Sequence, residues 1–141
     1  MRRVISTDDA PAAVGAYSQG TTTGELVFTA GQVALTPDGD FLEDASVAEQ
    51  TERALENVLA VLDAAGADAG DVLKTTVFLA DIEKFAEMNE TYATYFGDEP
   101  PARSAIEVGA LPLGAAVEIE AVACVPDAGS DSEPGADADG T

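Results

Sequence analysis

The sequence contains no histidine and no tryptophan, and its 141 residues include one cysteine and only six lysines and arginines. Without histidine the chain cannot form a Ser-His-Asp triad, a histidine general base or a histidine-ligated metal site. Its single cysteine, Cys124, can form neither an intrachain disulfide nor a thiolate metal cluster. These absences exclude most familiar hydrolase sites, and we expect no zinc or iron-sulfur centre.

Long hydrophobic runs are also missing, because the apolar stretches fall far short of the roughly 20 residues that a membrane span requires. The start Met1-Arg2-Arg3-Val4 is followed by Thr7-Asp8-Asp9 rather than by an apolar segment, so no secretory signal is visible. With 46% hydrophobic residues the chain is nevertheless apolar enough to fold. The length predicts one soluble domain, which we place in the cytoplasm.

Positive charge is scarce, and the 27 aspartates and glutamates give a formal net charge of -21. Such a surface repels polyanions, so neither nucleic acid nor an anionic membrane is expected as a partner. Molar salt shortens the Debye length to about 3 Å and makes this self-repulsion tolerable, which favours a halophilic cytoplasm over a merely acidic protein. The last segment, residues 126–141, is rich in acids, glycine and proline and predicts a disordered tail. Residues 1–125 still carry a net charge of -16, so the tail is not the source of the acidity.

Hydrophobic periodicity predicts an α+β fold. Apolar residues spaced by three and four predict a helix over residues 46–66, with Ser46 and Glu49 forming a capping box and Gly66 ending the helix. A second helix is expected from Asp81, as the N-cap, to about Gly97. Segments rich in β-branched residues predict strands at 26–35, 72–80, 104–108 and 116–125.

Alternation in the last strand predicts that its two faces differ. The apolar odd positions from Val117 to Val125 would face the helices, which leaves Glu118 and Glu120 on the other face together with two less polar residues. A half-covered face of this kind indicates packing between subunits. The alternative, which alternation alone favours, is a solvated face in a very acidic protein.

Three stretches could contribute chemistry. Arg103 stands at the mouth of a strand, where its planar guanidinium suits a small carboxylate, although for a lone arginine in so acidic a chain a structural salt bridge is the more common explanation. The stretches 15–20 (GAYSQG) and 29–33 (TAGQV) place glycines beside polar or aromatic side chains, which allows a ligand to approach closely or simply makes a turn.

Taken together, separated motifs along residues 1–125 resemble the Rid (RidA/YjgF) family of reactive-intermediate deaminases. They are, in order, APAA (10–13), GAYSQG (15–20), AGQV (30–33), KTTVF (74–78), MNETY (88–92), PARS (101–104) and VEIEAVA (117–123). The resemblance implies a chorismate mutase-like fold, with a six-stranded mixed sheet, two helices on one face and a homotrimer whose sites lie at subunit interfaces.

The activity implied by the resemblance is hydrolysis of enamine and imine acids, such as 2-aminoacrylate and 2-aminocrotonate, to 2-keto acids and ammonia, without a cofactor. Arg103 would hold the substrate carboxylate, and Glu118 would position or activate water with Tyr17 and Asn89 nearby. Gly31 and the backbone of Ala105 would complete the pocket. An imine carbon is already electrophilic once protonated, so a carboxylate that orients water suffices without histidine.

Two departures from the family pattern stand beside this expectation. Ala105 occupies a position where many members have cysteine, and Pro100 follows a shortened loop, residues 97–99, where many have an aromatic residue. The second departure is expected to alter the pocket rim and therefore the size of the substrate. The alternative function is a non-catalytic trimer that binds 2-keto acids or acts in a chaperone-like or regulatory role.

Overall fold

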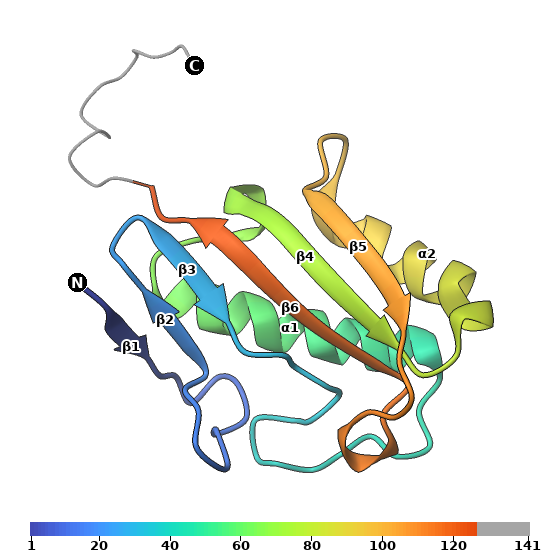
Figure 1. Cartoon of the computed structure of the whole chain (residues 1–141). Helices are drawn as coiled ribbons and strands as arrows, with labels where there is room; N and C mark the ends of the chain where they lie inside the picture. Colours follow the sequence, from blue (N-terminus) through green and yellow to red (C-terminus); the bar gives the residue numbers. More distant parts are fainter. Residues whose placement is uncertain (127–141) are drawn as a thin grey trace.

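Six strands form one mixed sheet, and Figure 1 shows both helices on the same face of it. The computed structural model describes residues 1–126, so the expected tail falls outside the described residues apart from Pro126. The strand order is β1-β2-β3-β6-β4-β5; only β4 and β5 run parallel. The strands are β1 (Arg3–Ile5), β2 (Gly20–Thr22), β3 (Leu26–Thr29), β4 (Val72–Leu79), β5 (Ala102–Glu107) and β6 (Val117–Cys124).

The first helix, α1 (Val47–Ala64), follows the local signals in its sequence. The Glu49 amide donates to Ser46 Oγ at 3.1 Å, and the Ser46 amide donates to Glu49 Oε1 at 3.0 Å, which completes the expected capping box. Gly66 follows the helix with φ +90°, a conformation that favours glycine. The predicted helix over 46–66 is therefore confirmed, with its regular part slightly shorter.

The second helix begins later than expected. Asp81 caps a short 3-10 helix, Ile82–Lys84, by accepting from the Glu83 amide, and α2 (Phe85–Phe96) continues from it. Because β4 and β5 are parallel, the chain must cross over between them, and α2 is that crossover.

The strand predicted over residues 26–35 is wrong in its second half. Regular pairing ends at Thr29, after which Gln32 makes an isolated bridge to Ile119 and Leu35 makes another to Phe41. This segment changes partners within a few residues, so it cannot extend one straight ladder, although its composition favours a strand. The strand expected at 104–108 begins earlier, at Ala102.

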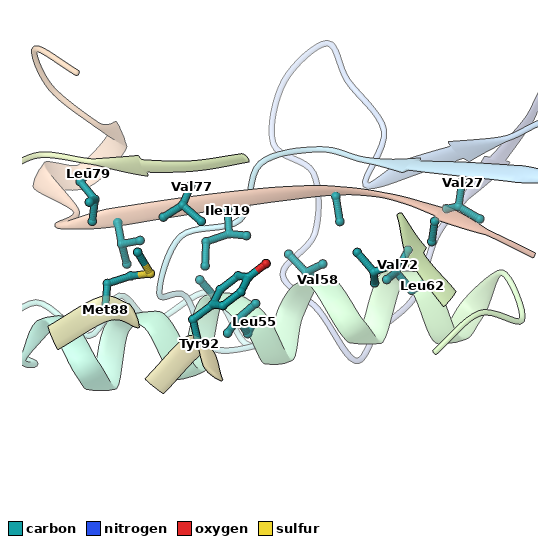
Figure 2. Close-up of a cluster of buried hydrophobic side chains, with 14 of the residues drawn as sticks. Val27, Leu55, Val58, Leu62, Val72, Val77, Leu79, Met88, Tyr92 and Ile119 are labelled. Carbon is teal, nitrogen blue, oxygen red and sulfur yellow. The ribbon is translucent and has the colours of Figure 1, made fainter. Parts of the chain in front are cut away.

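The core lies between the helices and the sheet (Figure 2). In β6, Val117, Ile119, Ala121 and Ala123 are buried while the alternating positions from Glu118 are partly or fully exposed, as the sequence predicts. We call the face of the sheet away from the helices the open face. Within residues 1–126, no helix combines the length and the apolar character needed to cross a membrane.

Candidate active site

Glu118 lies on the open face, directly over Gly31. The backbone amide of Gln32 donates to the Ile119 carbonyl at 2.8 Å, and the Gln32 carbonyl accepts from the Ile119 amide at 3.0 Å. These two bonds hold the neighbouring backbone of Gly31 against β6. A Cβ atom added to Gly31 would lie 2.5 Å from Glu118 Oε2 and 2.8 Å from its Cδ. Only glycine leaves room for the carboxylate in this position.

Burial raises the pKa of the Glu118 carboxyl, and the neighbouring charge of Glu120 raises it further. A carboxylate with a raised pKa is a better proton acceptor than a solvated one and exchanges protons closer to neutral pH. A group with this position and this direction of pKa shift can accept a proton from a molecule beside it.

A cavity of about 610 Å³ opens beside Glu118 and Gly31. Tyr17 also lines it, and the Tyr17 hydroxyl accepts from the Val14 amide at 3.4 Å. The rest of the wall is mainly apolar, made by Pro11, Ala12, Val14, Val33, Leu35, Pro37, Pro112 and Leu113, with Gln19, Gln32, Asp38 and Gly39 as the other residues. The structure thus brings together three of the predicted site residues, namely Tyr17, Gly31 and Glu118.

Two residues that shape this cavity were missed in the sequence. The buried Gln19 side chain fixes the N-terminal loop, donating to the Pro11 carbonyl at 2.7 Å and accepting from the Thr7 amide at 2.7 Å. Leu113 also lines the cavity with φ +62°, a strained conformation for leucine, and is 62% exposed. Gln19 belongs to a motif noted in the sequence, whereas nothing in the local sequence indicates a left-handed leucine.

Arg103 lies on the other face of the sheet, against α2. Its Nη1 donates to Asn89 Oδ1 at 2.7 Å, and its Cζ lies 4.7 Å from the ring centre of Tyr92 and 5.2 Å from that of Phe85. Asn89, which accepts this bond, is a neutral amide, so the contact brings no negative charge to the guanidinium. Asn89 was expected near Glu118, whereas within this chain it lies beside Arg103, because α2 packs on the helix side of the sheet.

A second cavity, of about 270 Å³, opens at Arg103. Pro100 and Pro101 line it together with Gly97, so the shortened loop noted in the sequence does form part of the rim. Ala105, two residues along β5, is half-buried and packs against the core on the helix side.

The predicted site residues therefore form two groups on opposite faces of one sheet. Arg103 is paired in register with Thr75, whose hydroxyl lies 2.7 Å from the Tyr92 hydroxyl beneath the helices. Glu118 is paired with Phe78, a position of the open face. The sheet itself separates the two groups within one chain.

No set of three histidine, cysteine, aspartate or glutamate side chains comes close enough to hold a metal ion within residues 1–126. The candidate groups are thus a carboxylate with its cavity and a guanidinium with its cavity. One can orient water and move a proton, and the other can bind an organic anion.

Comparison with known proteins places these groups in context. The family model described as endoribonuclease L-PSP matches residues 7–125. A rat 2-iminobutanoate/2-iminopropanoate deaminase is 48% identical over 123 residues, covering 87% of this chain and 90% of the rat protein. A RutC family protein of Pyrococcus horikoshii is 46% identical over 123 residues, covering 87% of this chain and 98% of that protein. The crystal structure of E. coli TdcF with bound serine superposes with a TM-score of 0.81 at 40% identity, covering 86% of this chain and 98% of that one.

Proposed function

Because the chain belongs to the endoribonuclease L-PSP family, to which RidA and YjgF also belong, we propose that it is a deaminase that hydrolyses 2-imino and 2-enamino acids to 2-keto acids and ammonia. The observation that carries the proposal is the Glu118 carboxylate, held over Gly31 beside a mainly apolar cavity with its pKa raised. The names of relatives at 45–48% identity, 2-iminobutanoate/2-iminopropanoate deaminase, agree with it. The small acids 2-aminoacrylate and 2-aminocrotonate are the proposed substrates.

The hydrolytic step and the binding of the carboxylate each have a group in the chain that can perform them. The enamine first takes a proton from solvent on its β carbon and becomes the iminium ion, which is the protonated imine. Glu118 then accepts a proton from water while the water oxygen bonds to the imine carbon, which gives a carbinolamine. Glu118 then returns this proton to the amino nitrogen, the carbon–nitrogen bond breaks and ammonia leaves, while the carbinolamine hydroxyl loses its proton to solvent and becomes the keto oxygen. Arg103 holds the substrate carboxylate throughout with two parallel hydrogen bonds.

The separation of Arg103 and Glu118 by the sheet supports a site made by two copies of the chain. Apolar side chains on the open face, including Phe28 and Ile106 at 46% exposure each, favour covering this face with another copy. In the proposed homotrimer, Arg103 of one subunit would face Glu118 of its neighbour. Assembly would then be a condition for activity.

The family description names a nuclease, but the charge of this chain argues against that activity. A net charge of -21 repels an RNA backbone, and the absence of histidine removes the usual general acid and base of metal-free RNA cleavage. A second candidate is binding of small carboxylates without turnover, which the serine in E. coli TdcF also suggests. Arg103 would serve both functions, whereas Glu118 serves hydrolysis.

The decisive experiment measures ammonia and 2-keto acid released from 2-aminocrotonate generated in the reaction mixture, in molar KCl, with and without the protein. Arg103→Ala should lower kcat/KM by about two to three decades, because losing a charged partner of this kind costs about 2–5 kcal/mol. Glu118→Gln should lower kcat more than it weakens binding of 2-ketobutyrate. Undiminished turnover in either variant would refute the assignment.

Mixing the two variants tests the shared site. Unfolding Arg103→Ala and Glu118→Gln chains together and refolding them should restore activity in about a quarter of the sites, because one interface in four then combines an intact Arg103 with an intact Glu118. The variants refolded separately serve as controls. Absence of any recovery would mean that both residues act from the same chain.

A further inference from the structure

Three residues on one stripe of α2 surround the Arg103 guanidinium. Phe85, Asn89 and Tyr92 follow a spacing of four and three, which places them on the same face of a helix over two turns. The Phe85 and Tyr92 ring centres lie 5.2 and 4.7 Å from Arg103 Cζ, while Asn89, between them in sequence, accepts from Nη1 at 2.7 Å.

Tyr92 is itself fixed in place. It is 3% exposed, its ring packs in the core beside Phe96 with centres 4.7 Å apart, and its hydroxyl shares a 2.7 Å hydrogen bond with the buried Thr75 hydroxyl. Figure 2 shows the Tyr92 side chain rising from the helix layer toward the sheet. Burial raises the pKa of the Tyr92 hydroxyl, so the ring stays neutral and its face attracts a cation.

We propose that Phe85 and Tyr92 are positioning residues that hold the Arg103 guanidinium in the orientation needed to bind a carboxylate, with Thr75 anchoring Tyr92. Without these contacts, an arginine on an edge strand would sample many rotamers. Fixing one rotamer when the substrate binds would then cost free energy and lower the affinity for the substrate. Aromatic contacts and the Asn89 bond restrict it before the substrate arrives. The two rings and the Asn89 amide carry no net charge, so they hold the guanidinium without compensating its positive charge. An aspartate in place of Asn89 would compete with the substrate carboxylate for the guanidinium.

This inference rests on the proposed function in one respect, namely that Arg103 binds the substrate carboxylate. Two measurements distinguish a failure of the inference from a failure of the proposed function. They are kcat/KM for deamination and the Kd of 2-ketobutyrate, which requires no turnover. Loss of turnover alone would contradict the proposed function, while the Kd values still test the role of Phe85 and Tyr92. Failure of the wild-type protein to bind 2-ketobutyrate would overturn the inference itself.

Phe85→Leu and Tyr92→Leu should each raise the Kd of 2-ketobutyrate about five- to tenfold, because each removes a ring face from the guanidinium. Tyr92→Phe keeps the ring and loses only the bond to Thr75, so it should cost about two- to threefold. Tyr95→Leu is the matched control: Tyr95 is on the same helix, but its hydroxyl donates to Glu56 at 2.9 Å, away from Arg103. This control should leave the Kd unchanged.

A double-mutant cycle separates positioning from a general loss of structure. In the Arg103→Ala background, Phe85→Leu should change the residual kcat/KM by less than about twofold, since no guanidinium remains to be held. Phe85 is only half-buried, so this variant should fold even if Tyr92→Leu does not. Equal losses with and without Arg103, or no loss in the wild-type background, would overturn the inference.

Nuclear magnetic resonance gives an independent reading. The Arg103 Nε–H proton should be shifted upfield by the two rings, and rotation of its guanidinium should be slowed. Both effects should diminish in Phe85→Leu and persist in Tyr95→Leu. An Arg103 signal with the shift of a free arginine in the wild-type protein would contradict the contacts on which the inference depends.

Discussion

Replacing Gly31 with alanine should damage catalysis while leaving the fold intact. The added methyl would lie 2.5 Å from Glu118 Oε2, whereas ordinary contacts begin near 3.4 Å, so the carboxylate oxygen must retreat by about 0.9 Å. The φ angle of Gly31 is outside the left-handed region, and the colliding atoms belong to a side chain that can rotate. The strain should therefore be relieved by moving Glu118 rather than the backbone.

A displacement of about 1 Å of a catalytic group can cost about 100-fold in rate. We therefore expect kcat for 2-aminocrotonate to fall about 100-fold in Gly31→Ala, with the Kd of 2-ketobutyrate changed by less than about threefold because Arg103 is untouched. The free energy of unfolding should change by less than about 1 kcal/mol, since the methyl displaces only one side chain. Stopped-flow ammonia release, calorimetric binding and denaturant unfolding measure these three quantities.

Gly109→Ala is the matched control, because a Cβ at Gly109 would have no atom within 4 Å and the backbone angle there is ordinary. It should leave kcat, Kd and stability unchanged. The reasoning would be refuted if Gly31→Ala retained kcat within about twofold of wild type. Equal losses of kcat and of 2-ketobutyrate affinity would also refute it, since they would indicate general damage to the site.

Three further predictions concern charge and stability. Glu120→Gln removes a negative neighbour that raises the pKa of Glu118, so the acidic limb of the pH–kcat profile should move to lower pH; a limb that stays in place would contradict the coupling. Asn57→Leu removes the buried amide that donates to the carbonyls of Val33 at 3.2 Å and Leu35 at 2.8 Å. The free energy of unfolding, measured by denaturant titration, should therefore fall by about 2–4 kcal/mol. An unchanged value would mean that water replaces the amide as the donor to these carbonyls. Each chain carries a charge of -21, so the subunits of the proposed trimer repel one another when salt does not screen the charge. Lowering KCl from about 2 M to about 0.1 M should therefore dissociate the trimer, measured by light scattering, and abolish turnover at the same salt concentration. A stable, active assembly at low salt would contradict the halophilic interpretation.

Parts of the fold that depend on local signals could be predicted from the sequence. The capping box of Ser46 and Glu49 and the glycine after α1 lie within the segment that they control, and the alternation of β6 directly assigns its two faces. Residues 30–35 could not be predicted in this way, because their path depends on Ile119 and Phe41, which are distant in sequence or separated by a turn. Composition favours a strand there, and the tertiary partners override it.

The sequence motifs named candidate site residues but could not give their arrangement in space. The motifs pointed to Tyr17, Gly31, Asn89, Arg103 and Glu118, but the separation of these residues by the sheet depends on the register of β4 with β5 and β6. No local pattern specifies that register. Phe85 and Tyr92 have the spacing of residues on one helix face, yet only the position of β5 shows that both rings face a guanidinium rather than another apolar side chain.

The arrangement of Arg103 and Glu118 on opposite faces has an evolutionary consequence. If each chain contributes its guanidinium to one pocket and its carboxylate to a different one, the two contributions can diverge separately after gene duplication. A copy that lost Glu118 would remain useful within a mixed assembly, since its Arg103 would still complete a neighbour's pocket. Sequences that lack a residue needed for turnover would then persist as subunits of mixed assemblies. Two alleles with different inactivating mutations, one at Arg103 and one at Glu118, would also complement each other.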